Sequence, residues 1–351
     1  MKRIILTGAC GFAGSTIAAG LLGAREGLEI IGLDNLSRPG SELNRLALQK
    51  LGVRLRHLDI RSASDMGTLE AADWVIDAAA NPSVLAGVAE GVTSRQVIEH
   101  NLGGTINLLE YCKAHRAGFI LLSTSRVYSI RELSSLKLAV KDQAYRPVAQ
   151  KVRGLTAAGV SEEFSTEPPL SLYGVAKRAS EQLALEYANS FGFGVYINRC
   201  GVMAGAGQFG KAEQGIFSFW IHSYKWKKPL RYLGFDGQGH QVRDCLHPRD
   251  LVPLLLRQMT GRPGPALCNF SGGMASGMSL RQLSDWCADR FGAHKVSGSR
   301  ETRPFDLPWL VLDSSLAARE WKWRPQTSRE TILEEIARHA EKRPDWLDIS
   351  R

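Results

Sequence analysis

Short apolar runs alternate with segments of helical periodicity along most of this chain. The runs are rich in Ile, Leu and Val, which is typical of strands buried on both faces of a sheet. This alternation predicts the α/β class, a Rossmann-type doubly wound parallel sheet covered by helices. We expect strands at Ile4–Leu6, Glu29–Leu33, Val53–Leu58, Trp74–Ala78, Gly118–Ser123, Gly194–Arg199 and Ala266–Phe270, and helices at Phe12–Ala24, Ser94–His115, Leu172–Phe191, Glu213–Tyr224, Leu280–Phe291 and Ser328–Lys342.

Residues 129–170 break this alternation, because their periodicity is weak. A long insertion of this kind in a compact domain is usually functional or mobile, so we expect an irregular wall or lid over an active site. The expected division is a nucleotide-binding domain over residues 1–200, which includes this insertion and is rejoined by strand 266–270. A smaller substrate-binding lobe is expected over residues 201–265 and 271–351.

A glycine-rich turn joins the first expected strand to the first expected helix. Gly8, Gly11 and Gly14 have the spacing G-x-x-G-x-x-G, and glycine lets a backbone turn tightly and approach a phosphate closely. The N–H groups and dipole at the start of the next helix favour an anion at the same place. Because the commoner dinucleotide fingerprint is G-x-G-x-x-G, the turn needs a second feature before it indicates a bound dinucleotide.

Asp34 supplies that second feature. It follows the second expected strand, twenty residues after Gly14, where a carboxylate can accept hydrogen bonds from ribose hydroxyls. A 2′-phosphate would be repelled there, so we expect NAD, although Arg38 is close enough in sequence to accommodate NADP. The glycine spacing and Asp34 also argue against a signal peptide beginning at Lys2-Arg3.

Composition narrows the class of protein further. The chain has a formal net charge of +9 and no apolar run of membrane-spanning length. Its six cysteines include no C-x-x-C pair and no metal-ligand spacing, so we expect a reduced, cytoplasmic setting and no metal. Residues 224–228 are basic and aromatic, but basic residues are otherwise spread out and no nucleic-acid-binding motif is present. We therefore expect no nucleic-acid or membrane partner, and an anionic substrate suits the charge.

The candidate chemistry lies at Tyr173 and Lys177. They are four residues apart on an expected helix, hence one turn apart on one face. An ammonium about 6 Å from a phenol, at an effective dielectric constant of about 20, stabilises the phenolate by roughly 2 to 3 kcal/mol. That lowers the pKa of the phenol toward neutrality and suits it to act as a general base. Tyr224 and Lys228 repeat the spacing, but among lysines and beyond the nucleotide-binding half.

These features resemble the extended short-chain dehydrogenase/reductase family, the NAD-dependent sugar-nucleotide epimerases and dehydratases, over nearly the whole chain. The motifs that carry the resemblance are Thr7-Gly8-x-x-Gly11-Phe12-x-Gly14, Asp34-Asn35-Leu36-Ser37, Asp59-Ile60, Asn101 with Gly104-Thr105, Thr124 with Val127-Tyr128, Tyr173 with Lys177, and Arg243-Asp244 with His247.

The resemblance implies a role for each matched residue. Tyr173, Lys177 and Thr124 would be catalytic, with the Thr124 hydroxyl bonded to the reacting sugar oxygen. A nucleotide-diphosphate sugar would be held by Gln208, Gln214, Arg243, Arg303 and Asp306. The helices Ser94–His115 and Leu172–Phe191 resemble those that pair across the family's homodimers. NAD would be contacted by Gly8, Gly11, Phe12, Gly14, Asp34, Asn35, Ser37, Asp59, Ile60, Ala78, Ala79, Asn101, Tyr173 and Lys177.

Within this family, the substrate-lobe motifs resemble the branch that inverts C2 of a CDP-linked deoxyhexose. These motifs are Gly207-Gln208-Phe209, Glu213-Gln214-Gly215 and the run from Gly237 to His247. A UDP-hexose 4-epimerase stays open as an alternative. A 4,6-dehydratase is disfavoured, because Ser125 and Arg126 stand where that branch has an Asp-Glu pair. A non-catalytic NAD-binding sensor is the alternative from a different class, and such sensors commonly lose the Tyr and Lys that are both present here.

Overall fold

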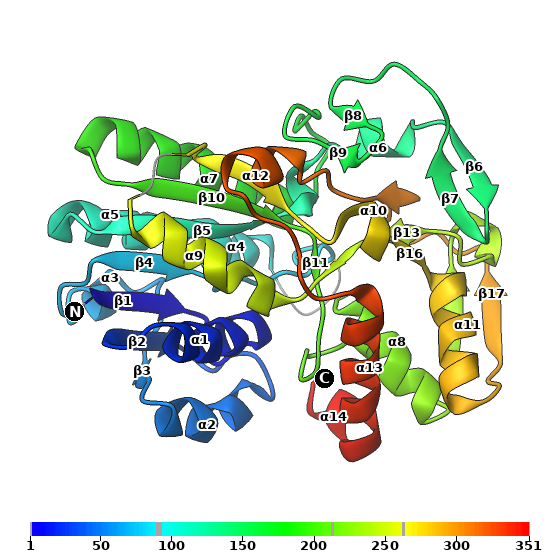
Figure 1. Cartoon of the computed structure of the whole chain (residues 1–351), viewed down its shortest axis with the longest axis horizontal. Helices are drawn as coiled ribbons and strands as arrows, with labels where there is room; N and C mark the ends of the chain where they lie inside the picture. The colour runs from blue at the N-terminus through cyan, green and yellow to red at the C-terminus, as the bar shows by residue number, and fades with distance from the viewer. Residues whose placement is uncertain (1, 89–92, 212–213, 262–263, 351) are drawn as a thin grey trace. The chain divides into compact units, whose positions relative to one another are not determined.

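The computed structural model describes residues 2–88, 93–211, 214–261 and 264–350 (Figure 1). The chain divides into two compact units. Unit 1 comprises Met1–Thr124, Leu172–Arg199 and Pro248–Cys268, and unit 2 comprises Ser125–Ser171, Cys200–His247 and Asn269–Arg351. This division differs from the expected one in two places. The insertion 129–170 belongs to unit 2, and residues 248–265 belong to unit 1, because their helix packs against the first helix of the chain.

Unit 1 is built on a parallel sheet. Seven strands of the described chain form it, in the order β15-β10-β5-β4-β1-β2-β3. β1 pairs in parallel with β2 and β4, and the outer neighbours β3 and β5 continue the same direction. All seven expected strands and the doubly wound class are confirmed. The strands are β1 (Lys2–Thr7), β2 (Leu28–Asp34), β3 (Arg54–His57), β4 (Trp74–Asp77), β5 (Gly118–Thr124), β10 (Val195–Cys200) and β15 (Leu267–Phe270).

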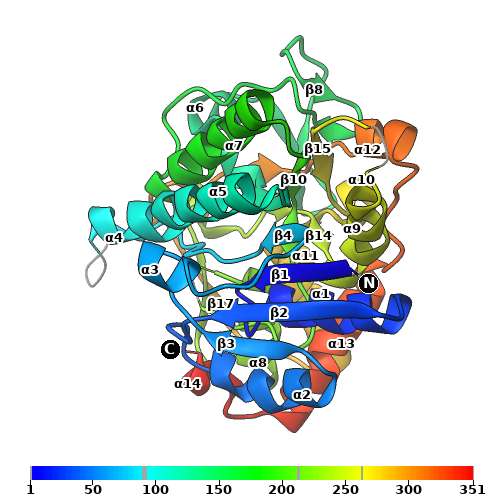
Figure 2. The ribbon, with the colours of Figure 1, turned by 90° about the vertical axis from the view of Figure 1, so that its left-hand side faces the viewer.

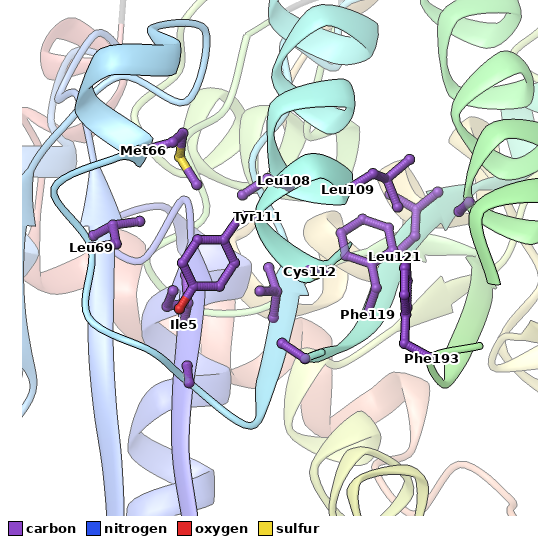
Figure 3. Packing of buried hydrophobic residues seen from close by; sticks show 14 of the residues in the cluster. Ile5, Met66, Leu69, Leu108, Leu109, Tyr111, Cys112, Phe119, Leu121 and Phe193 are labelled. Atoms are coloured by element: carbon purple, nitrogen blue, oxygen red, sulfur yellow. The ribbon is translucent and has the colours of Figure 1, made fainter. Parts of the chain in front are cut away.

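Helices cover this sheet (Figure 2). α1 packs against α2 and α9, whereas α5 packs against α3 and α7. Figure 3 shows Tyr111 of α5 beside Ile5 of β1, and Leu109 of the same helix near Phe119 of β5, in the apolar layer between helix and strands. The helices of unit 1 are α1 (Phe12–Ala24), α2 (Arg45–Lys50), α3 (Ala63–Met66), α4 (Ser94–Ile98), α5 (Gly104–His115), α7 (Leu172–Phe191) and α9 (Val252–Met259), with 3-10 turns at Ser41–Asn44 and Pro248–Leu251.

The expected continuous helix Ser94–His115 is interrupted. A π-helical turn at Glu99–Gly103 separates α4 from α5, and such turns are frequent at functional sites. Asn101 lies buried in this turn. Its side-chain amide donates to the carbonyls of Val97 (2.9 Å) and Asn81 (3.2 Å), and its oxygen accepts from the Asn81 N–H (2.9 Å). The amide therefore joins the π turn to the chain that follows β4.

Unit 2 consists of short strands and helices around two apolar clusters. Trp220 of α8 and Ile336 of α13 belong to one cluster, and Tyr128 and Trp309 belong to the other. The strands pair as β6 (Leu138–Lys141) with β7 (Ala144–Pro147), β8 (Leu155–Thr156) with β9 (Gly159–Val160), β11 (Val202–Met203) with β14 (Cys245–Leu246), β12 (Leu230–Leu233) with β17 (Val296–Ser299), and β13 (Val242–Arg243) with β16 (Met278–Ser279) and β18 (Trp309–Leu310). The helices are α6 (Ile130–Ser134), α8 (Ile216–Lys225), α10 (Gly273–Ser276), α11 (Leu280–Phe291), α12 (Ser315–Glu320), α13 (Arg329–Lys342) and α14 (Trp346–Ile349), with 3-10 turns at Ser125–Val127 and Phe235–Gly237.

The helices expected in unit 2 are confirmed with small shifts of their first residues. α11 has the expected bounds, and α13 begins at Arg329 because Ser328 caps it by accepting from the Thr331 N–H. α8 begins at Ile216, whereas Glu213, the first residue of the expected helix, lies outside the described residues.

The insertion 129–170 is ordered, so the expectation of an irregular segment is wrong. It contains α6 and the hairpins β6–β7 and β8–β9. Val160 and Phe164 pack in one cluster with Trp309, and the Val160 N–H donates to the carbonyl of Val311 (2.8 Å). These partners come from a distant part of the sequence, so they could not appear in the local periodicity of the insertion.

Candidate active site

The glycine turn lies where β1 ends and α1 begins. Gly8 has a φ of +61°, and a Cβ on Gly14 would lie 2.1 Å from the Gly8 carbonyl oxygen. Neither position therefore accepts a side chain, and the two glycines keep the turn tight. In the described chain no side chain caps α1, whose N-cap is Gly11. The positive end of the helix dipole is thus presented to an anion, as a pyrophosphate requires.

Thr7 ties the ends of β1 and β4 together beside this turn. Its hydroxyl donates to the Asp77 carboxylate (2.7 Å) and accepts from the N–H groups of Ala78 (3.1 Å) and Ala79 (3.0 Å). A Cβ on Gly8 would lie 3.0 Å from the Ala79 backbone. The structure therefore brings Ala78 and Ala79 against the glycine turn, as a cofactor cleft needs. Sequence reasoning missed Thr7 and Asp77, whose signal is a polar residue at the end of each buried strand.

Asp34 ends β2 next to the glycine turn. Its carboxylate accepts from the N–H groups of Cys10 (2.9 Å) and Leu36 (2.8 Å). Burial raises the pKa of Asp34, and these backbone donors oppose that rise. The carboxylate is therefore fixed at the position expected to bind the ribose hydroxyls, and it keeps lone pairs for them because each oxygen has two.

Asn35 links the other residues expected around the adenosine. Its amide donates to Asp59 (3.1 Å), and its oxygen accepts from the Ser37 N–H (3.1 Å). The Arg61 guanidinium beside Asp59 holds the pKa of that carboxyl below its usual range. The carbonyl of Ile60 accepts from Asn107 of α5 (2.8 Å). The expected cofactor residues after β2 and β3 therefore form one connected group.

The expected catalytic residues of unit 1 lie on α7 and β5. Tyr173 and Lys177 are one turn apart on α7, and both side chains are buried, with exposed fractions of 7% and 1%. α7 packs against β5, whose last residue is Thr124. Unit 1 alone thus carries the phenol, the ammonium and the hydroxyl of the expected set. A phenol with an ammonium one helical turn away is suited to proton transfer.

A buried ion pair on the same face of α7 was missed by sequence reasoning. The Glu181 carboxylate accepts from the Arg199 guanidinium through both oxygens (2.9 and 2.6 Å) and from the Ser123 hydroxyl (2.6 Å). Glu181 is fully buried and Arg199 is 2% exposed. Ser123 precedes Thr124 on β5. The four-residue repeat of Tyr173, Lys177 and Glu181 was the available signal, since it places all three on one helix face.

Asn101 supports the same helix through its backbone. The Ser180 hydroxyl of α7 donates to the Asn101 carbonyl (3.0 Å) and to the Ala176 carbonyl (3.0 Å). Together with the Glu181 ion pair, this bond holds α7 at two successive positions. The π turn therefore contributes to positioning Tyr173 and Lys177.

In unit 2, Arg243, Arg303 and Asp306 lie close together. The Arg243 guanidinium donates to Asp306 (2.9 Å) and to the Val242 carbonyl (2.7 Å). Burial lowers the pKa of Arg243, Asp306 raises it, and Arg303 lowers it further. The Asp244 carboxylate also acts on Arg243 and raises its pKa. Arg243 and Arg303 thus bring two guanidinium groups together, and guanidinium groups suit the oxygens of a diphosphate. Asp306 was expected to contact the substrate, and in the structure its carboxylate accepts from Arg243 and orients that guanidinium.

Gln208 and Gln214 lie on the loop that leads into α8. The Gln208 amide nitrogen donates to the Met203 carbonyl (2.5 Å), and its amide oxygen is buried without a hydrogen-bond partner in the described chain. Gln214 exchanges two backbone hydrogen bonds with Lys211 (2.7 and 3.1 Å). Leaving a buried acceptor unsatisfied costs about 1–3 kcal/mol. A hydroxyl or amide donor on a ligand would recover that free energy at Gln208.

Neither a metal centre nor a membrane span is found among residues 2–350 as far as they are described. Among the described residues, no group of three or more His, Cys, Asp or Glu side chains is arranged to hold a metal ion. No helix there combines the length and apolar composition needed to cross a bilayer. All six cysteines are buried, and none of them forms a disulfide within the described residues.

Similarity to known proteins agrees with this arrangement. The model of the NAD dependent epimerase/dehydratase family matches residues 4–265. The CDP-paratose 2-epimerase of Salmonella typhi is 30% identical over 93% of this chain and 95% of that protein. UDP-glucuronate 4-epimerase 4 of Arabidopsis thaliana is 26% identical over 95% of this chain and 74% of that protein.

Solved structures show the same fold. UDP-glucuronic acid 4-epimerase from Bacillus cereus, in complex with UDP-glucuronic acid and NAD, has a TM-score of 0.77 at 23% identity and covers 97% of this chain and 99% of that one. The expected resemblance to the extended short-chain dehydrogenase/reductases is confirmed, and NAD is the cofactor of the matched family. This chain therefore belongs to the NAD dependent epimerase/dehydratase family.

Proposed function

We propose that this protein is a CDP-paratose 2-epimerase-like enzyme, which interconverts CDP-paratose and CDP-tyvelose by inverting C2 of the sugar. The observation that carries the proposal is the buried Tyr173 and Lys177 pair on α7, which packs against the strand that ends at Thr124. The 30% identity to a CDP-paratose 2-epimerase over nearly the full length of both chains supports the choice of substrate.

In this proposal Tyr173 moves the proton. Its phenolate accepts the proton of the C2 hydroxyl, while Lys177 stabilises the phenolate and the Thr124 hydroxyl holds the reacting oxygen. Bound NAD supplies the hydride acceptor, from which the hydride can return to the sugar. The oxidised sugar carries a ketone at C2 and turns its other face toward the site. Tyr173 then returns the proton as the C–H bond re-forms with inverted configuration.

Unit 2 would hold the part of the substrate that does not react. Arg243 and Arg303 would bind the diphosphate, since two guanidinium groups suit a dianion. The buried oxygen of Gln208 would accept from a hydroxyl or amino group of the substrate. Gln214 would lie beside it, and Asp306 would bind the ribose. A firmly held diphosphate leaves the sugar free to present either face, as inversion requires.

A UDP-hexose 4-epimerase is the second candidate. The 26% identical UDP-glucuronate 4-epimerase supports it, and the same proton transfer at C4 would serve it. A 4,6-dehydratase is disfavoured, because Ser125 and Arg126 carry no carboxylate where that branch has an Asp-Glu pair. The Arg126 guanidinium instead donates to the Phe305 carbonyl (3.2 Å). A non-catalytic sensor is disfavoured because Tyr173 and Lys177 are both present.

We also propose that the protein acts as a cytoplasmic homodimer that supplies deoxyhexose for surface polysaccharide. Large apolar side chains are exposed on neighbouring helices of unit 1, and Phe191 at the end of α7 is 48% exposed. Ile98 of α4, Ile106 of α5 and Val175 of α7 have exposed fractions of 42%, 38% and 44%. A dimer would cover them, whereas a monomeric mass in light scattering would contradict this part of the proposal.

The test of the proposed reaction is direct. The purified protein with NAD is incubated with CDP- and UDP-linked hexoses, and the sugars are followed by NMR. Inversion at C2 of a CDP-linked deoxyhexose is expected. Inversion at C4 of a UDP-hexose would select the second candidate, loss of water would indicate a dehydratase, and no change in any sugar would favour the sensor.

A further inference from the structure

Two helices of unit 2, α8 and α14, hold the loop that carries Gln208. The indole N–H of Trp346, on α14, donates to the Gln208 carbonyl (2.8 Å), and the Ser218 hydroxyl of α8 donates to the same oxygen (2.8 Å). The Trp346 ring also stacks on Phe209, with centroids 5.2 Å apart and planes 16° from parallel. Both aromatic side chains are buried. The loop is thus attached to a helix more than a hundred residues further along the chain.

Trp346 also packs against a residue of α13. The ring of His339, on α13, packs edgewise against it at 4.6 Å. His339 Nδ1 lies 3.2 Å from His222 Nε2, on α8. α8, α13 and α14 therefore form a connected support for the indole. An indole fixed in this way directs its N–H at one carbonyl and has little freedom to turn elsewhere.

We infer that Trp346 is a positioning residue for substrate binding, acting through the Gln208 loop. Among the described residues, the buried amide oxygen of the Gln208 side chain has no hydrogen-bond partner. Since the backbone of the same residue is held by Trp346 and Ser218, the direction of that acceptor depends on both bonds. The inference rests on the proposed function, in which Gln208 receives a donor from the nucleotide sugar.

The test replaces only the N–H donor. Trp346→Phe keeps an aromatic ring on Phe209 and removes one of the two bonds to the Gln208 carbonyl. Tyr111→Phe is the matched control, because the buried Tyr111 hydroxyl donates to a backbone carbonyl, that of Glu70 (2.6 Å), in unit 1 and has no part in the support of Trp346. Both variants are studied as the full chain with NAD bound.

Two readouts are measured for each variant. In Trp346→Phe, KM for the nucleotide sugar should rise about 2- to 12-fold, the range for one lost hydrogen bond, with kcat within about 2-fold of wild type. Hydrogen exchange of the backbone N–H groups in residues 203–211, without substrate, should speed up by a similar factor. Tyr111→Phe should change neither KM nor the exchange rates of these residues. An unchanged KM and exchange in Trp346→Phe, or equal changes in both variants, would overturn the inference.

A double variant tests the route through Gln208. If Trp346 acts on the substrate only through that side chain, Gln208→Ala/Trp346→Phe should have the KM of Gln208→Ala alone. If the KM increases of the two single variants multiply in the double variant, the inference is contradicted. If the wild-type protein converts no nucleotide sugar, the proposed function fails, and hydrogen exchange of residues 203–211 alone decides whether Trp346 holds the loop.

Discussion

The buried Glu181–Arg199 pair offers a quantitative test of how α7 is held. Glu181→Gln keeps the size of the side chain but removes its charge. The Arg199 guanidinium, with its side chain 3% exposed, then lies buried without its counter-ion. One carboxylate oxygen accepts from Arg199 (2.6 Å) and the other from Ser123 (2.6 Å). In the variant an NH₂ group replaces one of these oxygens, so a donor faces a donor. The variant therefore combines a buried charge that has lost the Glu181 carboxylate with lost hydrogen bonds.

Breaking one partner of a buried ion pair destabilises a protein by about 3–5 kcal/mol. For a domain of 150–250 residues, each kcal/mol lowers Tm by about 2–4 °C, so the expected fall is roughly 6 to 20 °C. Calorimetry of the full chain can assign the transition to unit 1, because NAD should raise the Tm of the unit that binds it. kcat should fall as well, since α7 carries Tyr173 and Lys177.

The control is Glu186→Gln, an exposed carboxylate on the same helix, whose loss should change stability by less than about 0.5 kcal/mol. Glu181→Leu/Arg199→Met removes both charges and should recover most of the lost Tm, because apolar pairs of similar volume often replace buried ion pairs without loss. A fall below about 2 °C in Glu181→Gln, or an equal fall in Glu186→Gln, would refute the reasoning.

Three further predictions follow from the same geometry. Tyr173→Phe should lower kcat about 10²- to 10⁴-fold, whereas calorimetric NAD affinity should fall by at most about 12-fold, the effect of one lost hydrogen bond; turnover near the wild-type rate would rule Tyr173 out as the base. Gly14→Ala should weaken NAD binding at least about 10-fold, because the added Cβ has no room. Gly23→Ala, in open space on the same helix, should leave NAD affinity unchanged. Equal NAD affinities of the two variants would contradict a role of the glycine turn in binding the cofactor. Burial lowers the pKa of His222 to about 3 and of His339 to about 4. Below pH 6.5 the unfolded chain therefore binds more protons than the folded one, and the free energy of unfolding should fall as the pH drops. Each histidine should contribute a fall of about 1.4 kcal/mol per pH unit. His339→Gln removes one of the two histidines, so the loss of stability between pH 7 and 5, measured by urea unfolding, should be about half as large as in the wild type. Identical pH profiles of stability for the variant and the wild type would contradict this prediction.

The sheet could be predicted because its strands are locally distinct. Runs such as Ile4–Leu6 and Gly118–Ser123 are apolar and are followed by small or polar residues, so each strand and its end are visible without knowledge of the fold. The glycine turn and Asp34 were found for the same reason, since both follow such runs. The other expected cofactor residues, such as Asp59 and Ala78, came from the family resemblance. They follow β3 and β4, and the carboxyl ends of parallel strands meet at one edge of a sheet.

Features that depend on distant partners could not be predicted. The hairpin β8–β9 is only two residues long on each side, and the backbone of Val160 is bonded to Val311, which no local pattern reveals. The π turn at Glu99–Gly103 was also missed, because a shift in backbone bonding leaves the apolar periodicity of its flanks unchanged. Trp346 could be assigned only once its indole was seen on the Gln208 carbonyl.

The central claim is that the hydride removed from the sugar returns to the same carbon. It is tested most directly with CDP-paratose carrying deuterium at C2, incubated with the NAD-loaded protein in ordinary water. The account predicts CDP-tyvelose that keeps the deuterium at C2, because the label leaves and returns within one active site. Inversion with loss of the label to solvent would contradict it, since the C2 hydrogen would then have left as a proton.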